Sequence, residues 1–420
     1  MLARTVADLV QALAGDGPVA PPAGAAVAQH TGWQALRATG SELWVDAADF
    51  DGARAVWSEE FSGMTTNNAL LQADVADGRH DELIVRAGEQ LRRAPASHGL
   101  APDALVTEVA FVLNAVHGLR LARAFDATVC VELHTDLAGD ADGSVEYGRR
   151  LHAIAPDRFV VKVPLTPAGL LAVRRLEAAG VPVNCTLGFS PRQNRLAAEY
   201  ARPHFVNAFL GRVDGLLDRG RVAAGDAGIA AARSSQRVLP APAPGGAAHE
   251  VRQIAASLRS AEQLPALAGV DVLTMPPDVA RDFVAGGEAM TAGLRDRTGD
   301  ALSGDARDAL TAADAGVFCD DGELAAVVAH QLALRDDDGM DEPRLRAVLR
   351  DHGLGDLFPE LTAADRVRLA DDGKLPDWDH WRGRVADRSV SWDGLLNAAG
   401  LGAFSAAQRD LDGRIRRLLS

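Results

Sequence analysis

The feature that most constrains the fold of this 420-residue chain is a series of eight short apolar runs, separated mostly by helical patterns. Such alternation predicts parallel strands joined by helical crossovers. Eight is the number of strands that closes a (β/α)8 barrel, whose usual size is about 250 residues. The runs are SELWVDAA (41–48), FSGMTTN (61–67), ATVCVELH (127–134), RFVVKVP (158–164), VPVNCTLGF (181–189), HFVNAFLG (204–211), QIAASLR (253–259) and VDVLTMPP (270–277).

An open, doubly wound parallel sheet is the alternative arrangement of such units. That fold usually carries a Gly-rich phosphate-binding turn after its first strand, and none follows SELWVDAA. The sequence therefore favours the α/β class, as a (β/α)8 TIM barrel with additional C-terminal helices.

Three regions are expected along the chain. Residues 1–30 hold a helical pattern and a Gly/Pro/Ala-rich flexible lead, and residues 31–290 form the barrel catalytic domain. The stretch LPAPAPGGAAHE (239–250) reads as an exposed loop, because a strand pattern resumes after it. Strand patterns stop beyond about residue 287, so we expect residues 291–420 to form a helical extension packed on the barrel.

Composition narrows the classes of partner. A formal charge of −15 argues against broad nucleic-acid binding, so a phosphate site would need its own local positive charge. No run of about 18 apolar residues predicts a membrane span, and the N-terminus lacks the features of a secretory signal. Cys130, Cys185 and Cys319 show no metal-binding spacing, which fits a reducing cytoplasm. The acidic turns, such as RDDDGMDEP (335–343), do not match a calcium loop.

The lysine content is the strongest compositional clue to chemistry, because only two of the 43 basic residues are lysines. Lys374 lies in a polar turn, whereas Lys162 lies within the buried-strand pattern RFVVKVP. Arginine does not lose its proton in proteins, but a desolvated lysine can become a nucleophile. Lys162 therefore indicates amine chemistry, and the alternative is a strand-end lysine that pairs with a carboxylate.

Polar residues follow the predicted strands at their carboxyl ends, where barrel enzymes place their catalytic groups. A Schiff-base aldolase needs such a set: an amine, a proton donor, a base and groups that bind a phosphate. These residues are Asp46, Thr66, Asn67, Glu132, Lys162, Asn184, Thr186, Asn207, Arg212, Ser257 and Arg259.

Each of these residues also has a purely structural interpretation. Asp46 could cap a helix that starts near Asp51, Glu132 could form an ion pair inside the barrel, and Arg212 could pair with Asp214. Thr65, Thr66 and Asn67 could form a turn. The functional interpretation gains weight because the residues stand at the same end of successive strands.

Six segments, in order across about residues 40–285, resemble the transaldolase family. The most specific is FVVKVPLTPAGLLAVRRLEAAGVPVNCTLGFS, which carries Lys162 and the Asn-x-Thr pair Asn184 and Thr186. The others are LWVDAAD with Asp46, MTTNNALL with Asn67, VCVELHTDLAGD with Glu132, FVNAFLGRVD with Arg212, and AASLRS with Ser257 and Arg259.

The resemblance implies a metal-independent and cofactor-independent mechanism on sugar phosphates. Lys162 would form a Schiff base with the C2 carbonyl of sedoheptulose 7-phosphate or fructose 6-phosphate. Glu132 and Thr186 would hold the water that shuttles protons, and Asp46 would accept the hydroxyl proton during retro-aldol cleavage. Asn67 and Asn184 would orient hydroxyls of the dihydroxyacetone unit. The remaining substrate-binding residues implied are Thr66, Asn207, Phe209, Arg212, Ser257 and Arg259.

Two positions separate transaldolases from the related fructose 6-phosphate aldolases, which tend to carry Gln in place of Glu132 and Tyr in place of Phe209. This chain has the transaldolase residue at both. It departs from the family pattern at Asn68, where a proline is usual, at Ala69, where a serine is usual, and at Asn207, where a Ser or Thr is usual. These departures bear on substrate choice more than on chemistry.

The C-terminal region is longer than in compact family members. Its last segment, LGAFSAAQRDLDGRI (401–415), resembles the helix that packs near the family's active site. Residues 300–395 have no counterpart that we can place, and could form a lid or pair two copies in a homodimer. Two rival functions stay open: an aldolase or transaldolase for a different ketose, and a non-catalytic barrel that binds sugar phosphates.

Overall fold

The computed structural model describes residues 2–15, 30–95, 99–240, 249–335 and 339–420. Most of the predicted flexible lead, the centre of the loop 239–250 and part of the acidic turn 335–343 lie outside the described residues. The three regional boundaries predicted from the sequence stay predictions.

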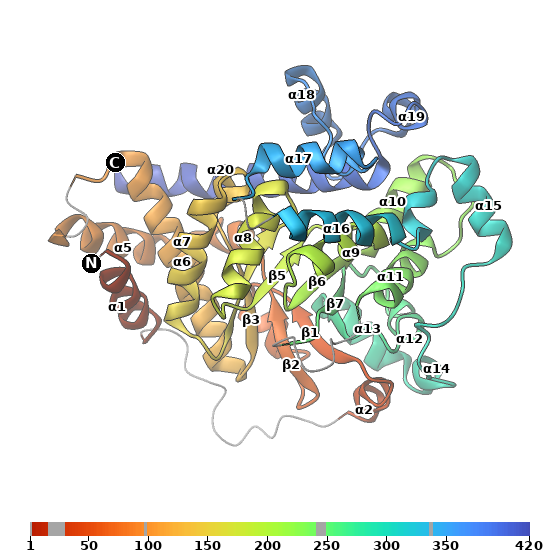
Figure 1. Cartoon of the computed structure of the whole chain (residues 1–420). Coiled ribbons are helices and arrows are strands. Elements are labelled where there is room, and N and C mark those ends of the chain that lie inside the picture. Colours follow the sequence, from red (N-terminus) through yellow and green to blue (C-terminus); the bar gives the residue numbers. More distant parts are fainter. Residues whose placement is uncertain (1, 16–29, 96–98, 241–248, 336–338) are drawn as a thin grey trace.

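Eight parallel strands close into a barrel in the order of the chain (Figure 1). Each of the eight predicted apolar runs overlaps one of these strands, and only β7 begins outside its run, by one residue, which confirms the predicted (β/α)8 fold with extra helices. The strands are β1 (Glu42–Asp46), β2 (Phe61–Thr65), β3 (Thr128–Glu132), β4 (Phe159–Pro164), β5 (Val183–Thr186), β6 (Phe205–Phe209), β7 (Arg252–Ala256) and β8 (Val272–Met275).

The strands read as apolar runs because both of their faces are covered. In β4 all six residues are buried, with alternate side chains facing the barrel interior and the surrounding helices. A charged residue in such a strand, as at Lys162, therefore points either into the helix layer or into the barrel.

Helices surround the barrel and continue beyond it into the C-terminal extension. Three helices, rather than one, connect β2 to β3. The helices up to β8 are α1 (Leu2–Gly15), α2 (Thr31–Arg37), α3 (Phe50–Arg54), α4 (Asn68–Val75), α5 (Asp81–Arg93), α6 (Pro102–Phe125), η2 (Thr135–Gly139), α7 (Ala141–Ile154), α8 (Pro167–Ala178), α9 (Pro191–Tyr200), α10 (Leu210–Arg219), α11 (Ala227–Val238) and α12 (Gln263–Ala266).

Helix α6 is long and apolar enough to cross a membrane by those two criteria alone. In this structure 78% of its most apolar stretch is buried inside the protein, and it packs between β3 and the outer helices α1, α5 and α20 (Trp392–Leu419). This is the pattern of a core helix.

In its described residues the extension after β8 consists of helices joined by loops and turns, with no strand, as expected from the sequence. Its last helix, α20, crosses the molecule beside α4, α5 and α6. The Nδ2 of Asn397 on α20 donates hydrogen bonds of 2.9 Å to the carbonyl oxygens of Leu165 and Leu187, which follow β4 and β5. The elements after β8 are α13 (Pro277–Gly286), α14 (Glu288–Thr291), α15 (Gly304–Ala312), η3 (Gly316–Cys319), α16 (Glu323–Arg335), α17 (Glu342–Asp351), η5 (Gly355–Leu357), α18 (Ala363–Asp372), α19 (Trp378–Ala386) and α20.

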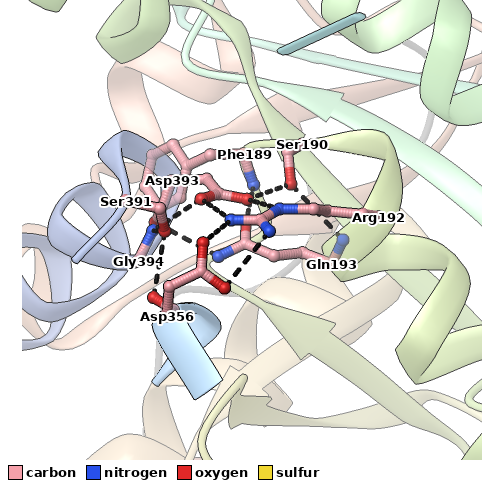
Figure 2. Close-up of polar contacts among 8 residues, drawn as sticks. All are labelled: Phe189, Ser190, Arg192, Gln193, Asp356, Ser391, Asp393 and Gly394. Carbon is pink, nitrogen blue, oxygen red and sulfur yellow. Dashed lines mark hydrogen bonds and ion pairs between the residues drawn. The ribbon is translucent and has the colours of Figure 1, made fainter. Parts of the chain in front are cut away.

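A buried ion-pair network fixes the start of α20 to the barrel (Figure 2). Arg192 on α9 binds Asp393 through two hydrogen bonds of 2.9 and 2.7 Å, and it also contacts Asp356 in η5. Ser190 Oγ donates to the same Asp393 carboxylate at 2.6 Å. The network joins α9, η5 and α20, and its central Asp393 side chain is fully buried, whereas Asp356 is partly exposed.

Removing the arginine from this network should be costly. In Arg192→Leu the Asp393 carboxylate would stay buried without its partner, so we expect the free energy of unfolding to fall by about 3–5 kcal/mol. Urea unfolding followed by circular dichroism measures the change. Arg175→Leu is the matched control, because it removes an exposed ion pair with Asp142 and should cost less than about 1 kcal/mol. Equal losses in the two variants would contradict a special role for the network.

Candidate active site

Lys162 lies in the middle of β4, and its side chain is only 3% exposed. Its register partners on the neighbouring strands are Glu132 on β3 and Asn184 on β5, so the three residues form one row across the barrel. The Nζ atom donates a hydrogen bond of 3.2 Å to the carbonyl oxygen of Thr66, after β2. The amine is therefore sheltered between successive strands, as the sequence predicted.

Glu132 is buried beside Lys162 at the end of β3. Burial raises the pKa of its carboxyl group, while the charge of Lys162 and a backbone hydrogen bond from Asn68 oppose that rise. The Asn68 N–H donates to Oε2 at 2.9 Å, and the Asn68 Nδ2 donates to the Leu133 carbonyl oxygen. The backbone amide of Asn68 thus orients the Glu132 carboxylate.

Asp46 ends β1 and accepts a hydrogen bond of 2.8 Å from Thr65 Oγ1. Thr65 in turn lies 2.7 Å from Thr274 Oγ1 on β8, so the hydroxyl of Thr274 supports the contact. Burial raises the pKa of Asp46, and the charge of Lys162 opposes the rise. The alternative that Asp46 caps the next helix is wrong, because Asp49 accepts the amide hydrogens at the start of α3.

Asn67 has a structural role in addition to any functional one. Its Oδ1 accepts hydrogen bonds from the amides of Ala69 and Leu70, at 3.0 and 2.9 Å, so the residue is the N-cap of α4. The structural interpretation therefore accounts for the side-chain oxygen of Asn67, which caps the helix. Its predicted contact with substrate stays a prediction.

Several predicted site residues carry buried polar atoms that find no hydrogen-bond partner within the described part of the chain. Buried polar groups in proteins are nearly always paired. An accumulation of unpaired donors and acceptors around a buried amine is therefore what a site for a polyhydroxylated ligand would show. The atoms are Thr66 Oγ1, Asn184 Oδ1, Thr186 Oγ1, Asn207 Oδ1 and Arg212 Nη1.

Three residues after β6 and β7 form the positive end of the site. Arg259 Nη2 donates to Ser257 Oγ at 2.9 Å, and Ser257 has a φ of 67°. Arg212 is buried, and burial together with the charge of Arg259 lowers its pKa to about 10. Asp214 does not neutralise Arg212, since its carboxylate accepts the Gly228 amide hydrogen at 2.6 Å. The exposed Arg259 and the buried Arg212 can both face a phosphate group.

Helix α20 covers the site at the carboxyl ends of the strands, where its Asn397 binds the residues that follow β4 and β5. The Phe404 ring lies 5.6 Å from Lys162 Nζ and 5.6 Å from the Arg212 guanidinium carbon. A Cβ on Gly400 would lie only 2.8 Å from Arg212 Nη1, so a glycine lets the helix approach. Sequence comparison pointed to this helix through residues 401–415, but single residues such as Phe404, Gly400, Thr274 and the Asn68 amide were not predicted.

Phe209 and the cysteines complete the surroundings of the site. The Phe209 ring lies 5.5 Å from the Arg212 guanidinium carbon. Cys130 is buried on β3, where its sulfur accepts a hydrogen bond of 3.4 Å from Asn184 Nδ2, and burial raises the pKa of its thiol to about 12. Cys185 is buried as well, which fits small apolar core residues rather than reactive thiols.

Comparison with known proteins decides the family. Residues 43–323, more than half of the chain, match the family described as Transaldolase/Fructose-6-phosphate aldolase. The chain belongs to this family. It is therefore an enzyme of the aldolase and transaldolase type, and the resemblance seen in the six sequence segments is confirmed.

Individual relatives agree with this assignment. A probable transaldolase of Thermus thermophilus is 33% identical over 247 residues, which cover 58% of this chain and 90% of the relative. A transaldolase of Xanthomonas euvesicatoria is 29% identical over 249 residues, covering 57% of this chain and 74% of the relative. A probable transaldolase of Hyphomonas neptunium is 38% identical over 152 residues, or 36% and 63% of the two chains. In each case the similarity leaves a large part of this chain unmatched.

The amide of Asn68 provides a specific test of how Glu132 is controlled. Asn68 is the first residue of α4, a position that accepts proline well, so Asn68→Pro should fold and lose the N–H that Glu132 accepts. Because this contact lowers the pKa of Glu132, its loss should raise that pKa. The limb of the pH profile of kcat/KM that reports Glu132 should then move to higher pH.

The matched control is Asn68→Ala, which keeps the amide and loses only the side-chain bond to Leu133. In this variant the same limb should stay at the wild-type pH. A profile that moves equally in both variants would assign the effect to the side chain instead.

Proposed function

We propose that this enzyme is a transaldolase, which transfers a dihydroxyacetone unit from a ketose phosphate to an aldose phosphate through a Schiff base on Lys162. The observation that supports it best is the row Glu132, Lys162 and Asn184 inside the barrel. Around it lie buried polar atoms without protein partners, including Thr186 Oγ1 and Arg212 Nη1.

The proposed reaction begins when Lys162 Nζ attacks the C2 carbonyl of the donor, and loss of water gives the Schiff base. Glu132 and Thr186 would hold the water molecule that carries protons in this step. Because burial raises the pKa of Glu132, its carboxyl group can keep a proton to donate at a higher pH than an exposed glutamate.

Cleavage then breaks the C3–C4 bond of the donor. Asp46 would accept the proton of the C4 hydroxyl, and the bonding electrons would move into the enamine on Lys162, while the first aldose phosphate leaves. The raised pKa of Asp46 suits a group that takes up a proton during turnover. Attack of the enamine on the aldehyde of the acceptor forms the new C–C bond, and hydrolysis frees Lys162.

Substrate contacts follow from the same arrangement. Asn184 and Asn207 carry unpaired buried oxygens that can accept hydrogen bonds from sugar hydroxyls. Ser257, Arg259 and Arg212 would bind the terminal phosphate, which supplies the local positive charge that a chain of net charge −15 otherwise lacks. Sedoheptulose 7-phosphate and fructose 6-phosphate are the donors that we propose.

Trapping with borohydride tests the Schiff base directly. In the presence of fructose 6-phosphate, reduction should fix a three-carbon unit on Lys162, which peptide mass mapping would locate. Lys162→Arg should give no adduct and lose turnover. Lys374→Arg is the matched control, since it changes the second and exposed lysine, and it should react like the wild type. A wild-type chain that gains no adduct would leave a sugar-phosphate-binding barrel as the better description.

Product analysis separates transfer from simple cleavage. With fructose 6-phosphate and erythrose 4-phosphate, the wild type should form sedoheptulose 7-phosphate and release little free dihydroxyacetone. Phe209→Tyr adds a hydroxyl near the proposed water, so the fraction of free dihydroxyacetone should rise several-fold. Phe205→Tyr, at the other end of β6, should leave that fraction unchanged. Release of mainly free dihydroxyacetone by the wild type would favour the fructose 6-phosphate aldolase alternative.

A further inference from the structure

A second cluster of chemically active side chains lies outside the barrel, between the three helices that connect β2 to β3. Asp74 comes from α4, His80 is the residue before α5, and His117 comes from α6. One oxygen or nitrogen atom from each of the three lies within 4.8 Å of the other two. Three segments that are separate in the chain therefore converge on one point.

His117 is the unusual member of this cluster. The residue is only 3% exposed, and neither Nδ1 nor Nε2 has a hydrogen-bond partner among the residues that the structure describes. The edge-to-face ring of Phe50, with centroids 5.8 Å apart, cannot satisfy a ring nitrogen as a hydrogen-bond acceptor would. Since buried polar atoms are rarely left unpaired, these nitrogens indicate a partner that is not a protein atom.

The charges of the three side chains suit a cation. A neutral imidazole such as that of the buried His117 offers a lone pair to a metal ion. Asp74 lies beside the imidazoles and supplies a carboxylate oxygen. The site thus offers one anionic oxygen and two imidazoles, with Arg79 Nη2 at 3.6 Å on the outer side of Asp74.

We propose that Asp74, His80 and His117 form a structural binding site for a divalent transition-metal ion, and that Zn²⁺ fits it best. Zn²⁺ takes nitrogen and carboxylate ligands at about 2.0–2.2 Å, so ligand atoms stand roughly 3.4 Å apart in a tetrahedral site. Small side-chain rotations would bring the three atoms to that spacing. On binding, His80 would take the tautomer with its proton on Nδ1, so that Nε2, now 2.6 Å from Asp74 Oδ2, presents its lone pair to the ion.

Two other clusters of histidine and acidic side chains, among the described residues, are less suited to a metal. His134 already uses Nδ1 to accept the Asp136 amide hydrogen and Nε2 to contact Asp412. In the cluster of Glu177, His204 and His249, the glutamate accepts two backbone amide hydrogens and the rings stack at 3.7 Å.

The proposed ion would take no part in the aldol chemistry, so the metal-independent mechanism expected for the family is unaffected. Its effect would be on α4, because it would tie the last turns of that helix to α5 and α6. The first residue of the same helix is Asn68, whose amide holds Glu132. A metal at Asp74 would thus stabilise the helix that supports the candidate active site.

The test uses the full chain after treatment with EDTA, with Zn²⁺ alone as the probe. Calorimetric titration near neutral pH and metal analysis after desalting should show one more equivalent of Zn²⁺ in the wild type than in His117→Leu. Zn²⁺ should raise the thermal midpoint of the wild type but not of that variant. Bound Co²⁺ should give the visible absorption of a tetrahedral site in the wild type only.

His330→Leu is the matched control, because His330 is exposed on α16 and should leave stoichiometry unchanged. Asp74→Asn is a second variant, which keeps His117 and should weaken binding by at least about ten-fold. It serves as the test should His117→Leu not fold. Absence of Zn²⁺ binding in the wild type, or an undiminished equivalent in His117→Leu and Asp74→Asn, would overturn the proposal.

Discussion

Placing an amine inside a closed barrel is the constraint on which the rest of this structure depends. A buried charge is costly unless it is paired, and Lys162 sits in a strand whose six residues are all buried. The chain meets this cost with Glu132 in the neighbouring register position and with Asp46, whose charges interact with Lys162. Burial in turn raises the pKa of both carboxyl groups. Burial around Lys162 therefore sets the protonation chemistry of both carboxyl groups together.

The position of α20 over the Lys162 amine depends on a different interaction, between residues far apart in the sequence. Phe404 reaches Lys162 only because α20 is held across the barrel, and α20 begins at the buried contact between Arg192 and Asp393. An ion pair of this kind contributes little net stability compared with apolar packing, but it tolerates few alternative arrangements. We interpret the C-terminal extension as the part of the structure that sets the position and angle of α20.

Much of the barrel could be predicted from sequence because its strands are buried on both faces, which makes them continuous apolar runs. Lys162 was predictable for the same reason, as a lysine inside such a run in a chain that otherwise uses arginine. The amide of Asn68 could not be predicted, since every residue except proline carries one and its use depends on tertiary position. The pairing of Arg192 with Asp393 joins residues 201 positions apart, and no local pattern marks it. Asn67 was difficult for another reason. Asparagine suits both the N-cap of a helix and the substrate contact that the family resemblance implies, so its residue type does not distinguish the two roles.

Electrostatics connect the two ends of the candidate site. Lys162, Arg212 and Arg259 contribute three positive charges against two from Asp46 and Glu132, so the interior is close to balanced although the whole chain carries −15. Burial makes the charged form of Arg212 unfavourable, as its lowered pKa shows, and Nη1 has no partner in the protein. An anionic group beside Arg212 would replace the favourable interactions with water that the guanidinium loses on burial. The attraction between the two charges is stronger in a buried site than on the surface, because water is excluded. Burial thus shelters the amine and also favours an anionic partner for Arg212, and the two groups each lie 5.6 Å from the Phe404 ring.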